Sequence, residues 1–346
     1  MERTIRRGRA VRSLRVGGNL RDVSIAVARR LALGLLTVWL IASVTFCLVI
    51  TAPGDPVVAL LGDDPDEDVR QRAALSFGTD QSAATQYALW IRRLARLDLG
   101  VSTSFRAPVD LVILDRLPTT LALVLPSVLL SSLLAVVVGM ATAAQRRAWR
   151  TAGTIVLSTL FAAIPIYVLA HALIAIFAVK LSWLPMQGLR DAHSMASGIA
   201  AILERIRHFI LPILTLMLHQ LVFAWLYLRG RIRQESRSVY LRTARAKGLT
   251  SWQVYYRHLW PNIRLGFAHF VAARLGQLLA GAALVETVFG LAGMGRLVVT
   301  ASLARDVPLV TGIFLFMAAL VVLANMTADA LTYLLDPRVA DEERHA

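Results

Sequence analysis

Three ionisable side chains lie inside long apolar segments of the sequence: Arg274, Glu286 and Asp329. A charge in a membrane interior is costly unless it is paired or hydrated, so such residues join helices or line a polar pathway. Arg274 and Asp329 lie at similar depths in their segments, and we expect them to form an ion pair. Glu286, near the opposite end of its segment, is expected to face a polar pathway or to extend toward the surface. Interhelical contacts without a substrate are the alternative for all three.

The sequence lacks the motifs of common catalytic, metal and nucleotide sites. It contains no G-x-x-x-x-G-K-[ST], H-E-x-x-H, C-x-x-C or G-x-S-x-G pattern. Without a P-loop, the chain is not expected to bind or hydrolyse ATP. His171, His219 and His269 lie singly in different apolar segments, which favours interhelical hydrogen bonds over a proton relay. We therefore predict no catalytic residue, no metal site and no cofactor in this chain.

A basic segment, 229–262, interrupts the apolar pattern. Residues 240–247 are helix-forming, and Gly248 suits the left-handed conformation that ends many helices. Thr250 or Ser251 can cap a second helix directly afterwards. Two short helices joined by a glycine make a rigid protrusion with the outline of a DNA-binding helix-turn-helix. Because it is tethered between apolar segments, a partner protein is the more natural target than nucleic acid.

Six segments are long and apolar enough to be membrane spans, since crossing a bilayer takes about 20 residues. Apolar residues make up 57% of the chain and charged residues 17%, and the mean hydropathy is +0.61, which argues against a soluble protein. The fold class is therefore an all-α membrane protein. The spans are 31–51, 119–144, 151–179, 209–228, 265–289 and 307–328, with Pro126, Pro165 and Pro212 tolerated inside them.

The charge distribution predicts the orientation of these spans. The net charge of the chain is +15. The segments 1–30, 145–150, 229–264 and 336–346 together carry +16, whereas the segments on the other side sum to zero. Positive charge collects on the cytoplasmic side of membrane proteins, so both termini are expected in the cytoplasm. The basic character is then a topology signal rather than a sign of nucleic-acid binding.

The organisation that follows has three parts. Residues 1–30 form a basic cytoplasmic extension, 31–335 a six-span domain, and 336–346 a cytoplasmic tail. The external segment 52–118 contains an acidic cluster, interpreted as a solvated helix start, and an amphipathic helix near residues 86–99 that lies on the membrane or packs on the bundle. Small residues at four-residue spacing in the fifth span predict close helix packing. These are Ala272, Gly276 and Ala280.

The segment Tyr240-Leu-Arg-Thr-Ala-Arg-Ala-Lys-Gly-Leu249, followed by Arg257-His258, resembles the cytoplasmic coupling loop of binding-protein-dependent ABC importers. More narrowly, it is similar to the oligopeptide, dipeptide and nickel permease family. The resemblance covers about residues 25–340 and departs from the family pattern at Trp260-Pro261. Further matching motifs, in family order, are Ala52-Pro-Gly-Asp-Pro56, Leu97-Asp-Leu-Gly100, Val285-Glu-Thr-Val-Phe289, Gly293-Met-Gly-Arg296 and Ala304-Arg-Asp306.

The resemblance implies a permease subunit that forms a translocation pathway with a second, related permease. Two ATPase subunits would bind ATP and magnesium, and an extracytoplasmic solute-binding protein would deliver the substrate. The coupling loop would dock on an ATPase subunit, with Arg245 and Lys247 contacting acidic groups and Ala244 and Ala246 allowing close approach. A solvated basic loop that only enforces topology is the alternative. The coupling residues are Tyr240, Arg242, Thr243, Ala244, Arg245, Ala246, Lys247, Gly248, Arg257 and His258.

The sequence thus predicts a cell-membrane permease of an ATP-driven importer, most simply for peptides. Nickel complexes and other small solutes are alternative substrates within the same family. A proton-coupled secondary transporter is the main rival class, but it predicts an inverted repeat and a mid-membrane carboxylate, and neither is seen. A membrane-embedded enzyme would need catalytic residues clustered at one depth, and none are clustered.

Overall fold

A computed structural model describes residues 20–51, 81–143, 148–191, 195 and 197–335. Within these ranges the chain is almost entirely helical, as predicted, apart from turns and an isolated pairing of Val101 with Pro108. The α-helices are α1 (Leu20–Thr51), α4 (Ala83–Leu94), α5 (Val109–Ala143), α6 (Ala148–Ala162), α7 (Ile166–Leu173), α8 (Gly198–Glu235), α9 (Val239–Ala246), α10 (Ser251–Gln253), α11 (Trp260–Ala273), α12 (Leu275–Val288), α13 (Met294–Leu303) and α14 (Val307–Leu335). Two π-helical stretches are η1 (Ile174–Lys180) and η2 (Val254–Leu259). The acidic cluster at 63–68, most of the N-terminal extension and the tail lie outside the described residues.

Among the described residues, three helices are each long and apolar enough to cross a membrane: α5, α8 and α14. Two pairs of helices are bent at a short break, and counting each pair as one span raises the number to five. The first pair is α6 and the helix formed by α7 and η1, and the second is the helix from Ser251 to Ala273 and α12. The apolar part of α1, Leu31–Cys47, is shorter. The described residues therefore carry three to five candidate spans, and the sixth stays a prediction.

The segment 151–179, predicted as one span, is not one continuous helix. The chain bends by 94° between α6 and the helix that starts at Ile166. Pro165 stands at the bend with an extended backbone and precedes the first residue of α7. A proline has no backbone N–H to donate, and it disfavours helical geometry in the residue before it. Pro126 and Pro212, by contrast, lie inside α5 and α8, which continue past them.

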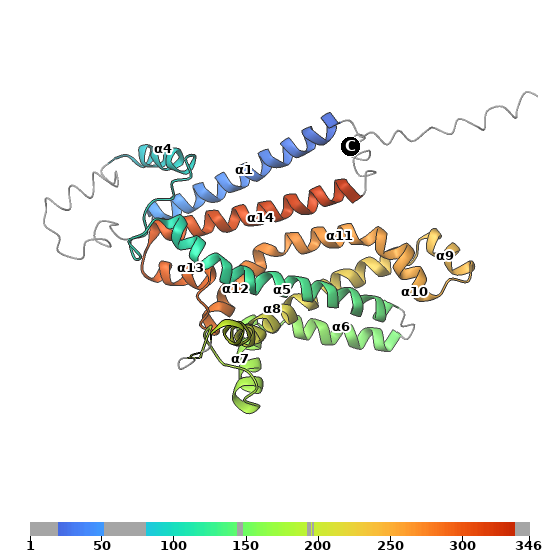
Figure 1. Cartoon of the computed structure of the whole chain (residues 1–346). Coiled ribbons are helices and arrows are strands. Elements are labelled where there is room, and N and C mark those ends of the chain that lie inside the picture. Colours follow the sequence, from blue (N-terminus) through green and yellow to red (C-terminus); the bar gives the residue numbers. More distant parts are fainter. Residues whose placement is uncertain (1–19, 52–80, 144–147, 192–194, 196, 336–346) are drawn as a thin grey trace, which may run out of the picture.

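The long helices α1, α5 and α14 lie roughly along one direction, and α7 runs across them (Figure 1). α1 packs beside α14, while α5 packs along α8. α9 and α10 project at one end, where α1 begins and α14 finishes. α4 and α13 lie at the opposite end. There α4 packs on α1. The Tyr87 hydroxyl lies 2.7 Å from the Ser43 hydroxyl, and the Phe46 ring meets Tyr87 edge to face and Trp90 at a tilt.

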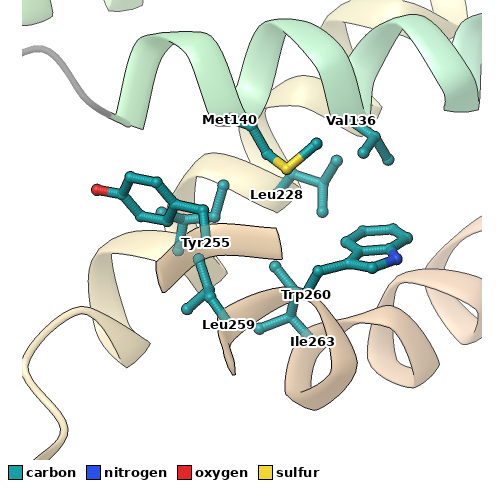
Figure 2. A pocket seen from close by; sticks show the side chains of 8 residues that line it. Val136, Met140, Leu228, Tyr255, Leu259, Trp260 and Ile263 are labelled. Carbon is teal, nitrogen blue, oxygen red and sulfur yellow. The ribbon is translucent and has the colours of Figure 1, made fainter. Parts of the chain in front are cut away.

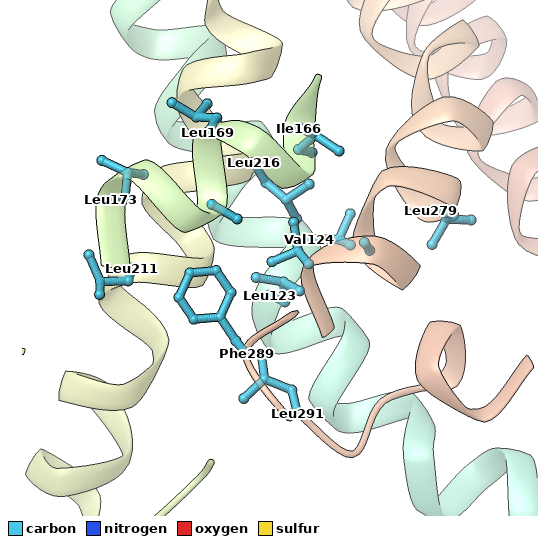
Figure 3. Close-up of a cluster of buried hydrophobic side chains, with 13 residues drawn as sticks. Leu123, Val124, Ile166, Leu169, Leu173, Leu211, Leu216, Leu279, Phe289 and Leu291 are labelled. Atoms are coloured by element: carbon cyan, nitrogen blue, oxygen red, sulfur yellow. The ribbon is translucent and has the colours of Figure 1, made fainter. Parts of the chain in front are cut away.

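The central core joins α5, α7, α8 and α12 through branched aliphatic side chains around Phe289 (Figure 3). Separate apolar clusters hold the two ends. Many large aliphatic side chains remain exposed on the outer surface of the helices, among them Leu35, Leu129 and Leu133. Extensive exposed apolar surface of this kind is typical of a protein surrounded by lipid or by other membrane subunits.

Candidate functional site: the α9–α11 protrusion and the polar residues of the bundle

The predicted helix–glycine–helix geometry is confirmed between α9 and α10. α9 ends at Ala246, and Gly248 adopts φ +80°, the left-handed conformation that favours glycine. Its amide donates to the Arg245 carbonyl at 3.0 Å, which closes the helix end. A Cβ added at Gly248 would meet no atom within 4 Å. The glycine is therefore required by its backbone angle and not by lack of space.

The second helix begins with a capping box formed by Thr250 and Gln253. The Thr250 hydroxyl accepts from the Gln253 amide at 3.3 Å, and the Gln253 side chain accepts from the Thr250 amide at 3.0 Å. The cap is thus Thr250, one of the two predicted candidates. From there the chain stays helical through η2 and α11 to Ala273. The protrusion is consequently continuous with a helix of the bundle.

The protrusion rests on an apolar base. Leu241 and Ala244 of α9 are buried with Val254, Tyr255 and Leu259 of the second helix. Figure 2 shows the region beside it, where Tyr255, Leu259, Trp260 and Ile263 lie close to Val136, Met140 and Leu228 of α5 and α8. Because Ala244 is only 5% exposed, its predicted role in close approach to a partner is wrong. A small residue is needed there by the packing within this chain.

The outward surface of the protrusion is basic and aromatic. Arg242, Thr243, Arg245, Ala246, Lys247 and Arg257 are exposed, and His258 is half-buried. Trp252 and Tyr256 stack with their ring centroids 6.2 Å apart and are 62% and 58% exposed. Sequence reasoning missed this pair, although aromatic residues four apart on a helix whose other face is apolar were a usable signal.

Tyr240 joins the protrusion to the bundle. Its hydroxyl donates to Glu235 Oε1 at 3.0 Å and accepts from Asn262 Nδ2 at 3.3 Å. Asn262 also donates to the His258 carbonyl. Partial burial, with a further contribution from Glu235, raises the pKa of the Tyr240 phenol. The neutral phenol therefore fixes the end of α8, the start of α9 and the start of α11 relative to one another.

Glu286 neither faces a polar pathway nor extends outward, so that expectation is wrong. Its side chain is fully buried and accepts from the Thr120 hydroxyl at 2.7 Å and the Arg296 amide at 2.9 Å. The Met294 amide donates to the same Thr120 hydroxyl. A Cβ at Gly293 would lie 2.3 Å from the Glu286 carboxyl carbon, so glycine makes room for it. The carboxylate thus ties α12 and α5 to the N-terminus of α13, where a helix favours negative charge.

The expected ion pair between Arg274 and Asp329 is not formed. Asp329 Oδ1 lies 2.8 Å from His269 Nε2, which joins α14 to α11. Arg274 Nε donates to Gln220 Oε1 of α8 at 3.0 Å, and the guanidinium lies 4.0 Å from the centre of the Phe223 ring. Similar depth along two helices does not fix the faces that the side chains occupy, and here the two residues face different neighbours.

The small-residue stripe does not lie on one straight helix. The chain bends by 46° between α11, which ends with Ala273, and α12. Ala272 is buried on the first side of the bend, while a Cβ at Gly276 would touch Val321 of α14 at 3.7 Å. Ala280 is exposed. Four-residue spacing across a bend therefore does not build a single packing surface.

A second buried carboxylate, missed as a site residue, lies at the same end as Glu286. Asp306 accepts from the Ser102 hydroxyl at 2.5 Å and from the Ser104 amide at 2.9 Å. It also accepts from the Leu309 amide and so caps α14. An aspartate directly before a long apolar helix was the signal that could have found it. In the described ranges, no three His, Cys, Asp or Glu side chains gather to hold a metal ion.

Two family profiles together match most of the chain. The family described as the inner membrane component of binding-protein-dependent transport systems matches residues 135–341, and the N-terminal membrane component of the same systems matches residues 25–124. The chain belongs to this family. The apolar helices agree with this family of inner-membrane components, and the chain is a multi-pass membrane permease of a binding-protein-dependent transport system.

Two relatives named as peptide permeases match over nearly their whole length. The chain is 31% identical to the di/tripeptide transport system permease protein of Pseudomonas aeruginosa, over 90% of this chain and 98% of that protein. It is 28% identical to the oligopeptide transport system permease protein of Bacillus subtilis, over 86% of this chain and 94% of that protein. The family resemblance read from the sequence is thereby confirmed.

Proposed function

We propose that the chain is the permease subunit of an ATP-driven importer of peptides. The names of the relatives from Pseudomonas aeruginosa and Bacillus subtilis support peptides as the substrate class. A second, related permease would complete the pathway. Two ATPase subunits would supply energy, and an extracytoplasmic binding protein would supply the substrate. Nucleic acid has no part in this assembly.

The observation that carries the proposal is the protrusion formed by α9 and α10. Its basic and aromatic surface is exposed, while its base is packed on α8 and α11. A surface of this kind fits a partner of the opposite charge, here an ATPase subunit. ATP and magnesium would be bound by that subunit, and this chain would not be catalytic by itself.

In the proposed membrane topology, six spans cross the cell membrane with both termini in the cytoplasm. The division of charge supports this, because the basic segment 229–264 includes α9 and α10, which project at one end of the bundle. Residues 1–30, 229–262 and 336–346 would be cytoplasmic, and 52–118 external. Changing Ser236 to Cys should then give a thiol that impermeant reagents cannot label in intact cells. Labelling of that thiol from outside would contradict the orientation.

The coupling role is tested by Gly248→Val in the complete transporter. A side chain at φ +80° is strained by about 1–2 kcal/mol, so the angle between the two helices should change. We expect normal insertion but loss of peptide uptake, through loss of the ATPase or through uncoupled hydrolysis. Gly230→Val is the matched control, because a Cβ there also meets no atom but the backbone is helical. Normal uptake by Gly248→Val with unchanged co-purification of the ATPase would refute the role.

A further inference from the structure

A cavity of about 400 Å³ lies between α8, α12 and the bend at the start of α7. Its volume falls in the range of small-molecule sites. The walls are largely apolar, with Ile166, Leu216 and Phe223 among them, and Gly281 leaves room on one side. Three polar side chains also line it: His219, Arg274 and Gln277. An apolar cavity with a few convergent polar groups is the usual form of a binding site.

Arg274 is the unusual member of this lining. A guanidinium carries its positive charge at every physiological pH. Throughout the part of the chain that the structure describes, no carboxylate lies within 4 Å of it, and its contacts are Gln220 and the rings of Phe223 and Phe270. An arginine inside a bundle of membrane helices is costly without an anion or water. The cavity therefore contains a positive charge whose acidic partner does not come from the described residues.

The side chains around Arg274 hold it in place. Gln220 is fully buried, and its carbonyl oxygen accepts from Nε of the guanidinium. The Phe223 ring covers one face of the guanidinium at 4.0 Å. With Nε and one face engaged, the two Nη groups are left for an acceptor. A carboxylate is the acceptor that fits the planar fork of arginine best, because two parallel hydrogen bonds can form.

We propose that this cavity is a transit subsite for a carboxylate of the transported substrate, with Arg274 as the binding residue and Gln220 as a positioning residue. The inference rests on the proposed function, since a peptide presents a terminal carboxylate that is ionised at neutral pH. His219 and Gln277 add hydrogen-bonding groups, and Leu216, Ile166 and Phe223 accommodate apolar side chains. A carboxylate of the second permease subunit has the same chemistry, and the experiment separates the two sources.

The test measures charge selectivity inside the cavity of the complete transporter. Cys47, the single cysteine of the chain, is changed to Ser, and Gln277→Cys places a thiol in the lining. The rates at which this thiol reacts with an anionic and with a cationic methanethiosulfonate reagent are measured. The anionic-to-cationic rate ratio is then divided by the same ratio for a free thiol in solution. We expect a preference for the anionic reagent of roughly tenfold, or about 1.4 kcal/mol. Arg274→Gln should abolish the preference, and Arg274→Lys should retain most of it.

A control thiol and a pair of peptides complete the experiment. Leu284 is exposed on α12 and lies outside the cavity lining. For a thiol introduced by Leu284→Cys, adding Arg274→Gln should not change the anionic-to-cationic rate ratio. Millimolar alanyl-alanine should slow modification of the thiol introduced by Gln277→Cys, whereas its C-terminal amide should not. A ratio unaffected by Arg274→Gln, or equal protection by the acid and the amide, would overturn the proposal.

A third outcome identifies the other source of the carboxylate. If Arg274→Gln loses the second permease on purification while Arg274→Lys keeps it, the carboxylate belongs to that subunit and the subsite proposal is wrong. Failure of the proposed function is distinct from either result. It would appear as absence of peptide uptake by the unmodified transporter, whatever the charge selectivity of the cavity.

Discussion

At the end of the bundle that contains α4 and α13, two carboxylates are buried and engaged within the chain. Glu286 accepts from α5 and α13, and Asp306 accepts from the 102–104 loop and from α14. At the α9–α10 end, basic side chains are exposed and the buried contacts are apolar. The two buried carboxylates of the first end have their partners within the chain, whereas the basic groups on the surface of α9 point outward. The first arrangement holds helix ends together within the chain, and the second leaves charged groups available for the partner that we propose.

The largest effect should come from removing the buried carboxylate. Glu286→Ala leaves the Thr120 hydroxyl and the Arg296 amide without their acceptor, and each buried unsatisfied donor costs about 1–3 kcal/mol. We expect a loss of about 3 kcal/mol or more, measured as a lower unfolding temperature of the purified chain in detergent. Glu286→Gln keeps one acceptor oxygen and should lose less than half as much.

Asp115→Ala is the control for this change. Asp115 lies on α5, is exposed and pairs with Arg116 at the surface, and exposed pairs contribute about 0–1 kcal/mol. Its removal should leave the unfolding temperature nearly unchanged. Equal unfolding temperatures for Glu286→Ala and Asp115→Ala would mean that the Glu286 end is not held by its buried polar contacts.

A smaller and more selective effect is expected from two alanines of α9. Ala244→Leu inserts a larger side chain into the buried base, and overpacking costs about 1–3 kcal/mol. Ala246→Leu lies on the exposed surface and should leave stability within about 0.5 kcal/mol. The second variant should instead weaken co-purification of the ATPase. The reverse pattern, with Ala246→Leu unstable and Ala244→Leu normal in assembly, would contradict the assignment of the two faces.

Local signals were sufficient to predict the protrusion. Gly248 ends a helix through its backbone conformation, and Thr250 starts the next helix through its side chain. Both effects involve only residues nearby in the sequence, so the sequence alone predicts them. Apolar runs likewise predicted where the long helices lie. Pro165, however, ends a helix while Pro126 and Pro212 do not, and the three look alike in the sequence. Packing of the surrounding helices decides between these outcomes, and a single sequence does not contain it.

The polar residues of the bundle were predicted by type but not by partner. Position along a helix gives depth, whereas pairing also depends on rotation about the helix axis. Arg274 therefore faces Gln220 and Phe223 of α8, while Asp329 faces His269 of α11. The sequence placed Glu286 near the correct end of its apolar segment. It did not predict the close approach of the Glu286 carboxyl group to Gly293 in the following turn, because that contact depends on the three-dimensional packing.

The helical segment from Ser251 to Ala273, which includes η2, connects the protrusion to the interior of the bundle. At 1.5 Å per residue it is about 34 Å long, so a tilt of about 10° at the protrusion displaces the far end by about 6 Å. The far end is the bend at Arg274, which lines the cavity. A small rotation imposed on α9 and α10 would thus move a positive charge by about the length of one helical turn, across the space that the substrate would occupy.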